Sequence, residues 1–175
     1  MYKFLLRRKI KRTIAQSERE RAYHNLKEIN SILVLFDTKD YGDAIHFIQR
    51  LKEMKKKIKV IAFKDNNDTN NYSKITYTIV TKKDTKGDSL TQITNSLADA
   101  KFDLIVDLTL KENLLLLYFL VTANAPLKVG FYKHPLSVHD MVISFAPELV
   151  QGVKELGRHL IHYLTIISSE PKKGR

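Results

Sequence analysis

The sequence SILVLF occupies residues 31–36, and the sequence FDLIVDL occupies residues 102–108. The first run is continuously apolar and the second is strongly strand-like, as expected for strands that are buried on both faces. Such strands occur in parallel sheets whose two faces are covered by helices. The two runs therefore predict an α/β domain with a Rossmann-like, mainly parallel sheet flanked by helices.

Helical and strand-like patterns alternate around these two runs, in the order β-α-β-β-α-β-α-β-β-α. The length of 175 residues favours a single domain, which we place at residues 31–168. A basic helical arm at 1–30 precedes this domain, and a polar tail at 169–175 follows it. The other strands are expected at 58–63, 75–80, 127–131 and 141–145, and the helices at 44–54, 87–97, 112–124 and from 147 or 148 to 167.

The composition limits the classes of protein and of site that are possible. There is no Cys, which excludes disulfides, thiolate metal ligands and a cysteine nucleophile. The most apolar run, residues 114–123, is too short to cross a bilayer, which requires about 20 apolar residues. No apolar segment typical of a signal peptide follows the basic N-terminus. We therefore expect a cytoplasmic protein.

Most of the excess positive charge lies at the N-terminal end of the chain. Residues 1–27 carry nine Lys and Arg against two Glu, a formal charge of +7 out of a total of +11. Residues 2–12 contain neither Pro nor Gly and are rich in good helix formers. At about 100° per residue, the cations of this helix point in every direction, and Phe4 and Leu5 also point different ways.

A helix that is charged on all sides is suited to a crevice between nucleic-acid phosphates. We therefore predict that the tip of the arm inserts among RNA helices, which requires it to stand clear of its own domain. A frayed, solvated tail and a peripheral membrane helix are the alternatives, although the second needs a broad apolar face. A narrow stripe is expected to continue the helix and rest on the domain, formed by Ala15, Ala22, Leu26 and Ile29.

Lysines on the domain would add phosphate contacts, which position a protein without reading the base sequence. The predicted RNA-binding residues are Lys3, Arg7, Arg8, Lys9, Lys11, Arg12, Arg19, Arg21, Lys55, Lys56 and Lys57. Three further lysines of the domain could add phosphate contacts, namely Lys59, Lys82 and Lys83.

No motif in the sequence predicts catalysis. The chain lacks G-x-G-x-x-G, G-x-x-x-x-G-K-[ST] and G-x-S-x-G, so dinucleotide, P-loop and α/β-hydrolase chemistry are not expected. We expect a protein that is not an enzyme, with no catalytic residue, cofactor, metal or small-molecule substrate.

Two groups of polar residues have both a structural and a functional interpretation. His134, His139 and Asp140 could ligate zinc, but a polar loop that contains two His by chance is the simpler interpretation. Asp37 and Asp43 follow the first strand, where α/β folds bind ligands. Roles in a turn and at the start of a helix are favoured for these two carboxylates.

Two stretches resemble the N-terminal half of the heptosyltransferase-type glycosyltransferases. They read ILVLFDTKDYGDAIHFIQRLKE at residues 32–53 and FDLIVDLTLKENLLLLYFLVTANAPLKVGFY at residues 102–132. The Gly42-Asp43 pair and residues 128–131 match the pattern of that family, and Asp43 would correspond to its catalytic base. The nucleotide-sugar site of the family lies mainly in a second Rossmann-like half, before which the given residues end. The resemblance therefore implies the fold more than the activity, with a glycosyltransferase-like half-domain as an alternative function.

The whole chain also resembles a lineage-restricted bacterial family of small basic proteins of uncharacterised function. The features that carry this resemblance are the opening MYKFLLRRKIKR, the length and the truncated body. The resemblance implies an extra protein of the large ribosomal subunit. We therefore expect a non-enzymatic ribosome component that binds ribosomal RNA and contacts neighbouring ribosomal proteins.

Overall fold

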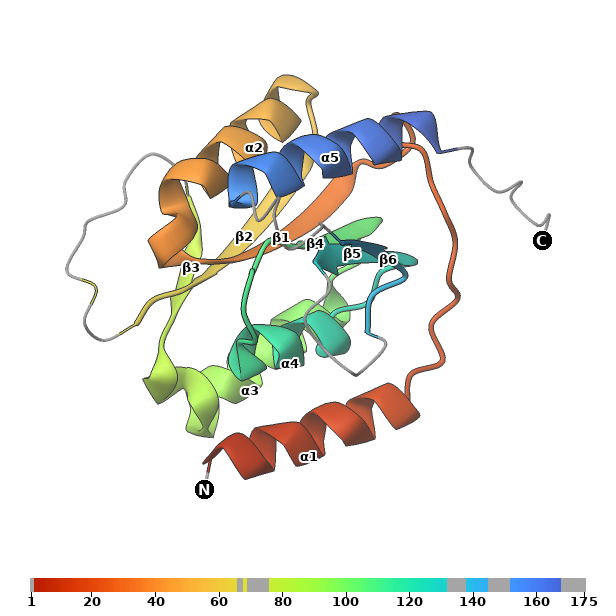
Figure 1. Cartoon of the computed structure of the whole chain (residues 1–175). Coiled ribbons are helices and arrows are strands. Elements are labelled where there is room, and N and C mark those ends of the chain that lie inside the picture. Colours follow the sequence, from red (N-terminus) through yellow and green to blue (C-terminus); the bar gives the residue numbers. More distant parts are fainter. Residues whose placement is uncertain (1, 66–67, 69–75, 132–137, 145–151, 168–175) are drawn as a thin grey trace.

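Six parallel strands form one sheet, which is covered by helices on both faces (Figure 1). The structure is a computed structural model and describes residues 2–65, 68, 76–131, 138–144 and 152–167. The strands are β1 (Ser31–Asp37), β2 (Lys57–Phe63), β3 (Thr78–Val80), β4 (Leu104–Asp107), β5 (Leu127–Phe131) and β6 (Met141–Ile143). Their order in the sheet is β3-β2-β1-β4-β5-β6, so that β1 and β4 lie at the centre.

The helices lie in three layers around the sheet (Figure 1). They are α1 (Tyr2–Ala15), α2 (Tyr41–Glu53), α3 (Gly87–Asp99), α4 (Leu114–Thr122) and α5 (Val153–Ile166), with 3-10 turns η1 (Thr38–Asp40) and η2 (Lys82–Thr85). α2 and α5 cover one face of the sheet, and α3 and α4 cover the other. α1 forms a further layer outside α4.

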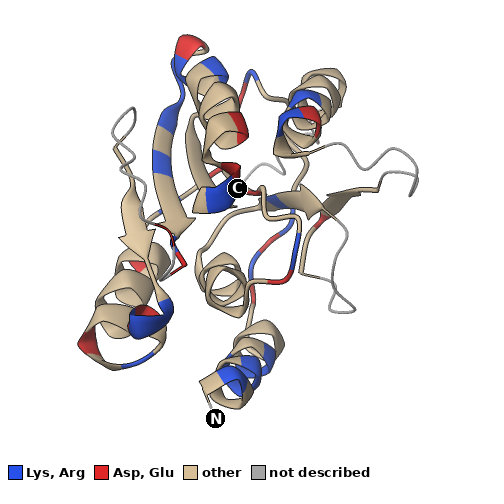
Figure 2. Ribbon diagram, turned by 60° about the vertical axis from the view of Figure 1, so that its left-hand side comes forward, with Lys and Arg blue, Asp and Glu red and all other residues tan. Residues whose placement is uncertain are grey.

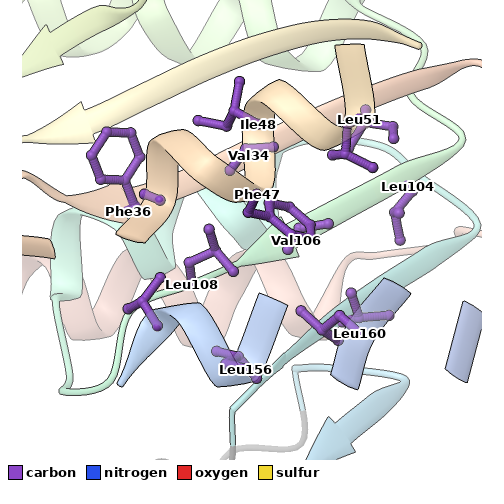
Figure 3. Close-up of a cluster of buried hydrophobic side chains, with 14 of the residues drawn as sticks. Val34, Phe36, Phe47, Ile48, Leu51, Leu104, Val106, Leu108, Leu156 and Leu160 are labelled. Carbon is purple, nitrogen blue, oxygen red and sulfur yellow. The ribbon is translucent and has the colours of Figure 1, made fainter. Parts of the chain in front are cut away.

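The side chains of β1 alternate between two hydrophobic clusters, because successive residues of a strand point to opposite faces. Ile32, Val34 and Phe36 pack in the cluster that includes residues of α2 and α5. Figure 3 shows Val34 and Phe36 in this cluster. Leu33 and Leu35 pack on the other face with residues of α3 and α4. Full burial of such side chains stabilises the fold by about 1.5–3 kcal/mol each. This double burial explains why the run at 31–36 contains no polar alternation.

The predicted fold class is confirmed, and the strands and helices after residue 30 follow the predicted order. All strand pairs of the sheet are parallel. The main differences are at the ends of elements. The Asp37 side chain accepts a hydrogen bond from the N–H of Lys39 and starts η1, which leads directly into α2 at Tyr41. The helix therefore begins before residue 44, where it was expected.

The prediction of a helical arm over residues 1–30 is wrong for its second half. The helix ends at Ala15, and residues 17–30 form a strap without regular helix that leads to β1. The N–H groups of Ala22 and Leu26 donate to the carbonyls of Pro126 and Leu164 rather than to carbonyls of their own segment. The apolar spacing that suggested a helix instead serves a segment that is fastened to β5 and α5.

Candidate nucleic-acid interface

The basic N-terminal helix is docked on the domain. Leu6 and Ile10 occupy one face of α1 and are 2% and 1% exposed against α4. α4 is apolar nearly all round, so the side that faces away from the sheet would expose apolar side chains to water if α1 did not pack against it. The prediction that this tip stands clear of its own domain is therefore wrong. A stripe of two residues was enough for docking because the surface opposite it is so apolar.

Two of the predicted RNA-binding cations lie at the flanks of the contact between α1 and α4. Arg7 forms an ion pair with Glu112, with 3.2 Å between Nη2 and Oε2. The ammonium of Lys9 lies 5.7 Å from the ring centroid of Tyr118. An exposed ion pair and a surface cation–π contact stabilise a fold by about 1 kcal/mol or less each. These contacts orient α1, while Leu6 and Ile10 supply most of its attachment.

The opposite side of α1 faces solvent and combines cations with apolar side chains. Figure 2 shows the Lys and Arg positions of this helix, which lies at the outside of the molecule. Phe4 is 71% exposed and Leu5 is 52% exposed. Although their side chains are about 100° apart around the helix, both lie in the half that faces away from Leu6 and Ile10, together with three exposed cations. This surface is called the outer face of α1 below, and it consists of Phe4, Leu5, Arg8, Lys11 and Arg12.

The two arginines of the strap have different environments. The Arg19 guanidinium donates to the carbonyls of Ala125 and Pro126 and pairs with Asp140 at 2.7 Å, and its side chain is only 12% exposed. Arg21 lies 3.4 Å from the same carboxylate, but its side chain is 68% exposed. Arg19 thus holds the strap against the sheet, whereas Arg21 presents most of its surface to solvent.

The structure does not gather the predicted lysines of the domain in one place, and Lys59 donates to Ser96 of α3. Lys55 and Lys57 are exposed at the junction of α2 and β2, and the Lys56 ammonium donates to the carbonyls of Lys27 and Ile29. This junction belongs to the edge of the sheet where β1 and β2 begin, on the side of α2. The three lysines therefore do not join the outer face of α1, which lies beyond α4.

Lys82 lies instead near the start of α1. A cavity of about 340 Å³ is lined by Lys82, Lys3 and Arg7, together with residues that follow β1 and β4. Lys39 and Lys111 are two of these residues, and neither was among the binding residues predicted from the sequence. The signal that could have found them is their position directly after central strands, at the carboxyl edge of a parallel sheet.

The polar residues that raised the question of a zinc site have separate partners. The Nε2 atom of His139 lies 3.1 Å from Oδ2 of Asp107, and both side chains are about 5% exposed or less. A Cβ atom on Gly130 would lie 2.7 Å from that Nε2, so only glycine leaves room for the imidazole. Asp140 pairs with Arg19 and Arg21. His134 lies outside the described residues.

Lys128 in β5 is a buried cation with 3% of its surface exposed. Its ammonium donates to the carbonyl of Leu120 at 2.6 Å, at the C-terminal end of α4, where such carbonyls lack helical partners. Burial, and to a lesser extent the charge of Arg19, lowers the pKa of Lys128 from 10.5 to about 7, while Asp140 opposes the shift. Lys128 is therefore a helix cap that changes its charge close to neutral pH.

The carboxylates after β1 have the structural roles that the sequence favoured. Asp37 caps η1 through the N–H of Lys39. Asp43 lies in the first turn of α2, as favoured, and its Oδ2 also accepts from the N–H of Lys154 in the first turn of α5 at 3.4 Å. Between them, Asp40 carries a buried Oδ2 that has no hydrogen-bond partner among the described residues. Its burial raises the pKa of Asp40, although Lys39 lowers it.

The model of the family described as "Family of unknown function (DUF6913)" matches residues 3–167. The chain belongs to this family. The match begins inside α1 and continues into α5, so it includes most of the basic helix as well as the domain. No curated protein and no solved structure matched the chain.

None of the helices in the described part of the chain is long and apolar enough to cross a membrane. Those same residues contain no group of three or more His, Cys, Asp or Glu side chains that could hold a metal ion.

Proposed function

We propose that the protein is a non-enzymatic RNA-binding protein, and specifically a component of the large ribosomal subunit that binds ribosomal RNA in the cytoplasm. The observation that carries the proposal is the outer face of α1. It presents Arg8, Lys11 and Arg12 to solvent, in a protein with a formal charge of +11. The resemblance to small basic bacterial proteins supports the assignment to a ribosome.

The docked position of α1 changes the expected mode of binding. Because α4 covers one side of the helix, phosphates cannot surround it and must approach from the outer face or from its flanks. RNA would therefore lie along α1 instead of surrounding it. Arg8 and Arg12 match the geometry of phosphate groups with planar guanidinium forks. The exposed ring of Phe4 is placed to stack on an unpaired base near the start of the helix.

The test is the salt dependence of binding to a labelled RNA hairpin, measured by fluorescence anisotropy from about 50 to about 200 mM salt. In the test variant, Arg8, Lys11 and Arg12 are replaced by Ala. Loss of three phosphate contacts should reduce the slope of log K against log salt by about 2 to 3.

A matched control removes the same charge from the face that is covered by α2 and α5. Lys52, Lys154 and Arg158 are exposed there, so their replacement by Ala lowers the net charge equally without touching α1. The control should keep most of the slope. Equal loss of slope in both variants would show that general charge, and not the outer face, causes binding. Sucrose-gradient sedimentation of a lysate then asks whether the native protein migrates with ribosomal particles.

A second candidate is a peripheral membrane protein, which the exposure of Phe4 and Leu5 beside cations favours. Apolar insertion into a bilayer resists salt better than phosphate contacts do. Co-sedimentation with anionic liposomes that persists at high salt and is lost in Phe4→Ser with Leu5→Ser would support this candidate. Binding to RNA that these two substitutions leave intact would argue against it.

A further inference from the structure

A cavity of about 340 Å³ lies at the carboxyl edge of the sheet, next to its topological switch point. The order β3-β2-β1-β4-β5-β6 reverses direction between β1 and β4, and the walls include segments that directly follow both strands. Parallel α/β sheets bind ligands in the crevice at this position, because neighbouring connections leave in opposite directions. The volume lies within the range of small-molecule sites, at about 300–1,000 Å³.

Five cations line the cavity against two carboxylates. Arg7 pairs with Glu112 at 3.2 Å, Lys39 lies 3.7 Å from Asp37, and Lys82 pairs with Asp65 at 3.0 Å. The cations come from separate segments of the chain, namely Lys3 and Arg7 from α1, Lys39 from η1, Lys82 from η2 and Lys111 from the connection to α4.

Two of these cations have no neighbouring group among the described residues that neutralises their charge. Within the described part of the chain, the side chains of Lys3 and Lys111 form no ion pair or hydrogen bond. Charges of one sign that gather around a concave site repel one another unless an anion neutralises them. The N-terminus of α4 adds little, because Oδ1 of Asn113 already accepts from the N–H groups of Leu115 and Leu116. Lys3 and Lys111 are therefore the groups that would hold an anion. Lys39 can join them, because its ammonium is as far as 3.7 Å from Asp37 and its side chain is 51% exposed.

The remaining walls are suited to a ligand that is larger than an inorganic anion. Tyr2 and Phe63 place aromatic surface in the cavity, and Leu114 adds aliphatic surface. An aromatic ring beside a cationic site can stack on a nucleobase. The carboxylates of Asp37 and Glu112 are hydrogen-bond acceptors for hydroxyl groups such as those of ribose.

We propose that this cavity binds one nucleotide, whose phosphate contacts Lys3, Lys39 and Lys111 and whose base lies against Tyr2. The nucleotide is either a free nucleoside 5′-phosphate or a nucleotide within RNA, since both present the same phosphate, sugar and base. The site is separate from the outer face of α1, and it does not depend on RNA binding by that face.

Isothermal titration with AMP, GMP, CMP and UMP at constant salt tests the proposal. At least one of these nucleotides should bind, and more tightly than adenosine or inorganic phosphate alone. Lys39→Gln with Lys111→Gln should weaken the binding by at least about tenfold, because two charge-assisted contacts are lost. Both lysines are exposed, so the fold should persist, as circular dichroism would verify. Tyr2→Ala should weaken the binding of the nucleotide but not that of phosphate.

The control replaces Arg8 and Lys11 by Gln, which removes the same charge from the outer face of α1 and should leave nucleotide affinity within about twofold. Absence of nucleotide binding, or equal weakening in the control, would overturn the proposal. Competition distinguishes the two sources of the ligand. Displacement of the bound nucleotide by a short RNA would assign the cavity to RNA, and binding of both together would assign it to a free nucleotide. Loss of salt-dependent RNA binding with nucleotide binding intact would refute only the function proposed above.

Discussion

Replacement of Lys128 by Met should change how the stability of the protein depends on pH. Lys128 is 3% exposed in β5, and its ammonium caps the end of α4 through the carbonyl of Leu120. Burial lowers the pKa of this side chain from 10.5 to about 7 in the folded state. Between these two values, the unfolded chain binds a proton that the folded chain has released. The free energy of unfolding of the native protein should therefore rise with pH across this window.

The size of the effect follows from the shift. One pKa unit corresponds to about 1.4 kcal/mol, so the full window is worth about 5 kcal/mol, of which about 2 kcal/mol falls between pH 7 and pH 9. Met has a similar length but carries no proton. The stability of Lys128→Met relative to the native protein should thus fall by about 2 kcal/mol from pH 7 to pH 9. In a chain of this size, that difference corresponds to about 4–8 °C in Tm.

Urea unfolding at pH 7, 8 and 9 measures this change, with circular dichroism as the signal because the chain contains no Trp. Lys57→Met is the matched control, since the Lys57 side chain is exposed in β2 and is not removed from water on folding. A difference between native protein and Lys128→Met that stays constant from pH 7 to pH 9 would refute the reasoning. It would mean that the carbonyl at the end of α4 and the nearby Asp140 keep the amino group charged.

Two further predictions concern packing. Leu6→Ala with Ile10→Ala should detach α1 from α4, because each substitution weakens the docking of the helix by up to about 2–5 kcal/mol. The amides of α1 should then lose protection from hydrogen exchange, whereas those of β1 should keep it. Unchanged protection of α1 would contradict the docked arrangement. Gly130→Ala should destabilise the protein by about 1–3 kcal/mol, because its Cβ would displace His139. In the control Gly42→Ala, the Cβ meets nothing within 4 Å, so the substitution should stabilise α2 by about 0.5–1 kcal/mol. Equal effects of the two substitutions in thermal unfolding would exclude the steric cause.

The fold could be predicted because its information is local. An apolar run such as residues 31–36 can be buried on both faces only inside a sheet that helices cover on each side. The charge of α1 and the structural role of Asp37 could also be predicted from the sequence. The formal charge follows from the residue types alone, and a cap depends on residues that are close in the sequence. The function of the basic helix is still a proposal, since charge indicates the class of partner and not its identity.

The placement of α1 needed the tertiary structure. On a helical projection, Leu6 and Ile10 form too narrow a stripe to predict docking, and their burial depends on the apolar outer side of α4. The strap at residues 17–30 has helical spacing, but hydrogen bonds to Pro126 and Leu164 give it another conformation. In both cases the deciding partner is more than 100 residues away in the chain.

The same separation explains the groups at the edge of the sheet. His139 lies 3.1 Å from Asp107, in space that the absence of a Cβ at Gly130 leaves free. The cations of the cavity come from segments as distant as residues 3 and 111. The sequence by itself determined which elements form and how much charge the chain carries. Only the tertiary structure decided which polar groups share a site, because the ends of parallel strands bring together residues that no local pattern connects.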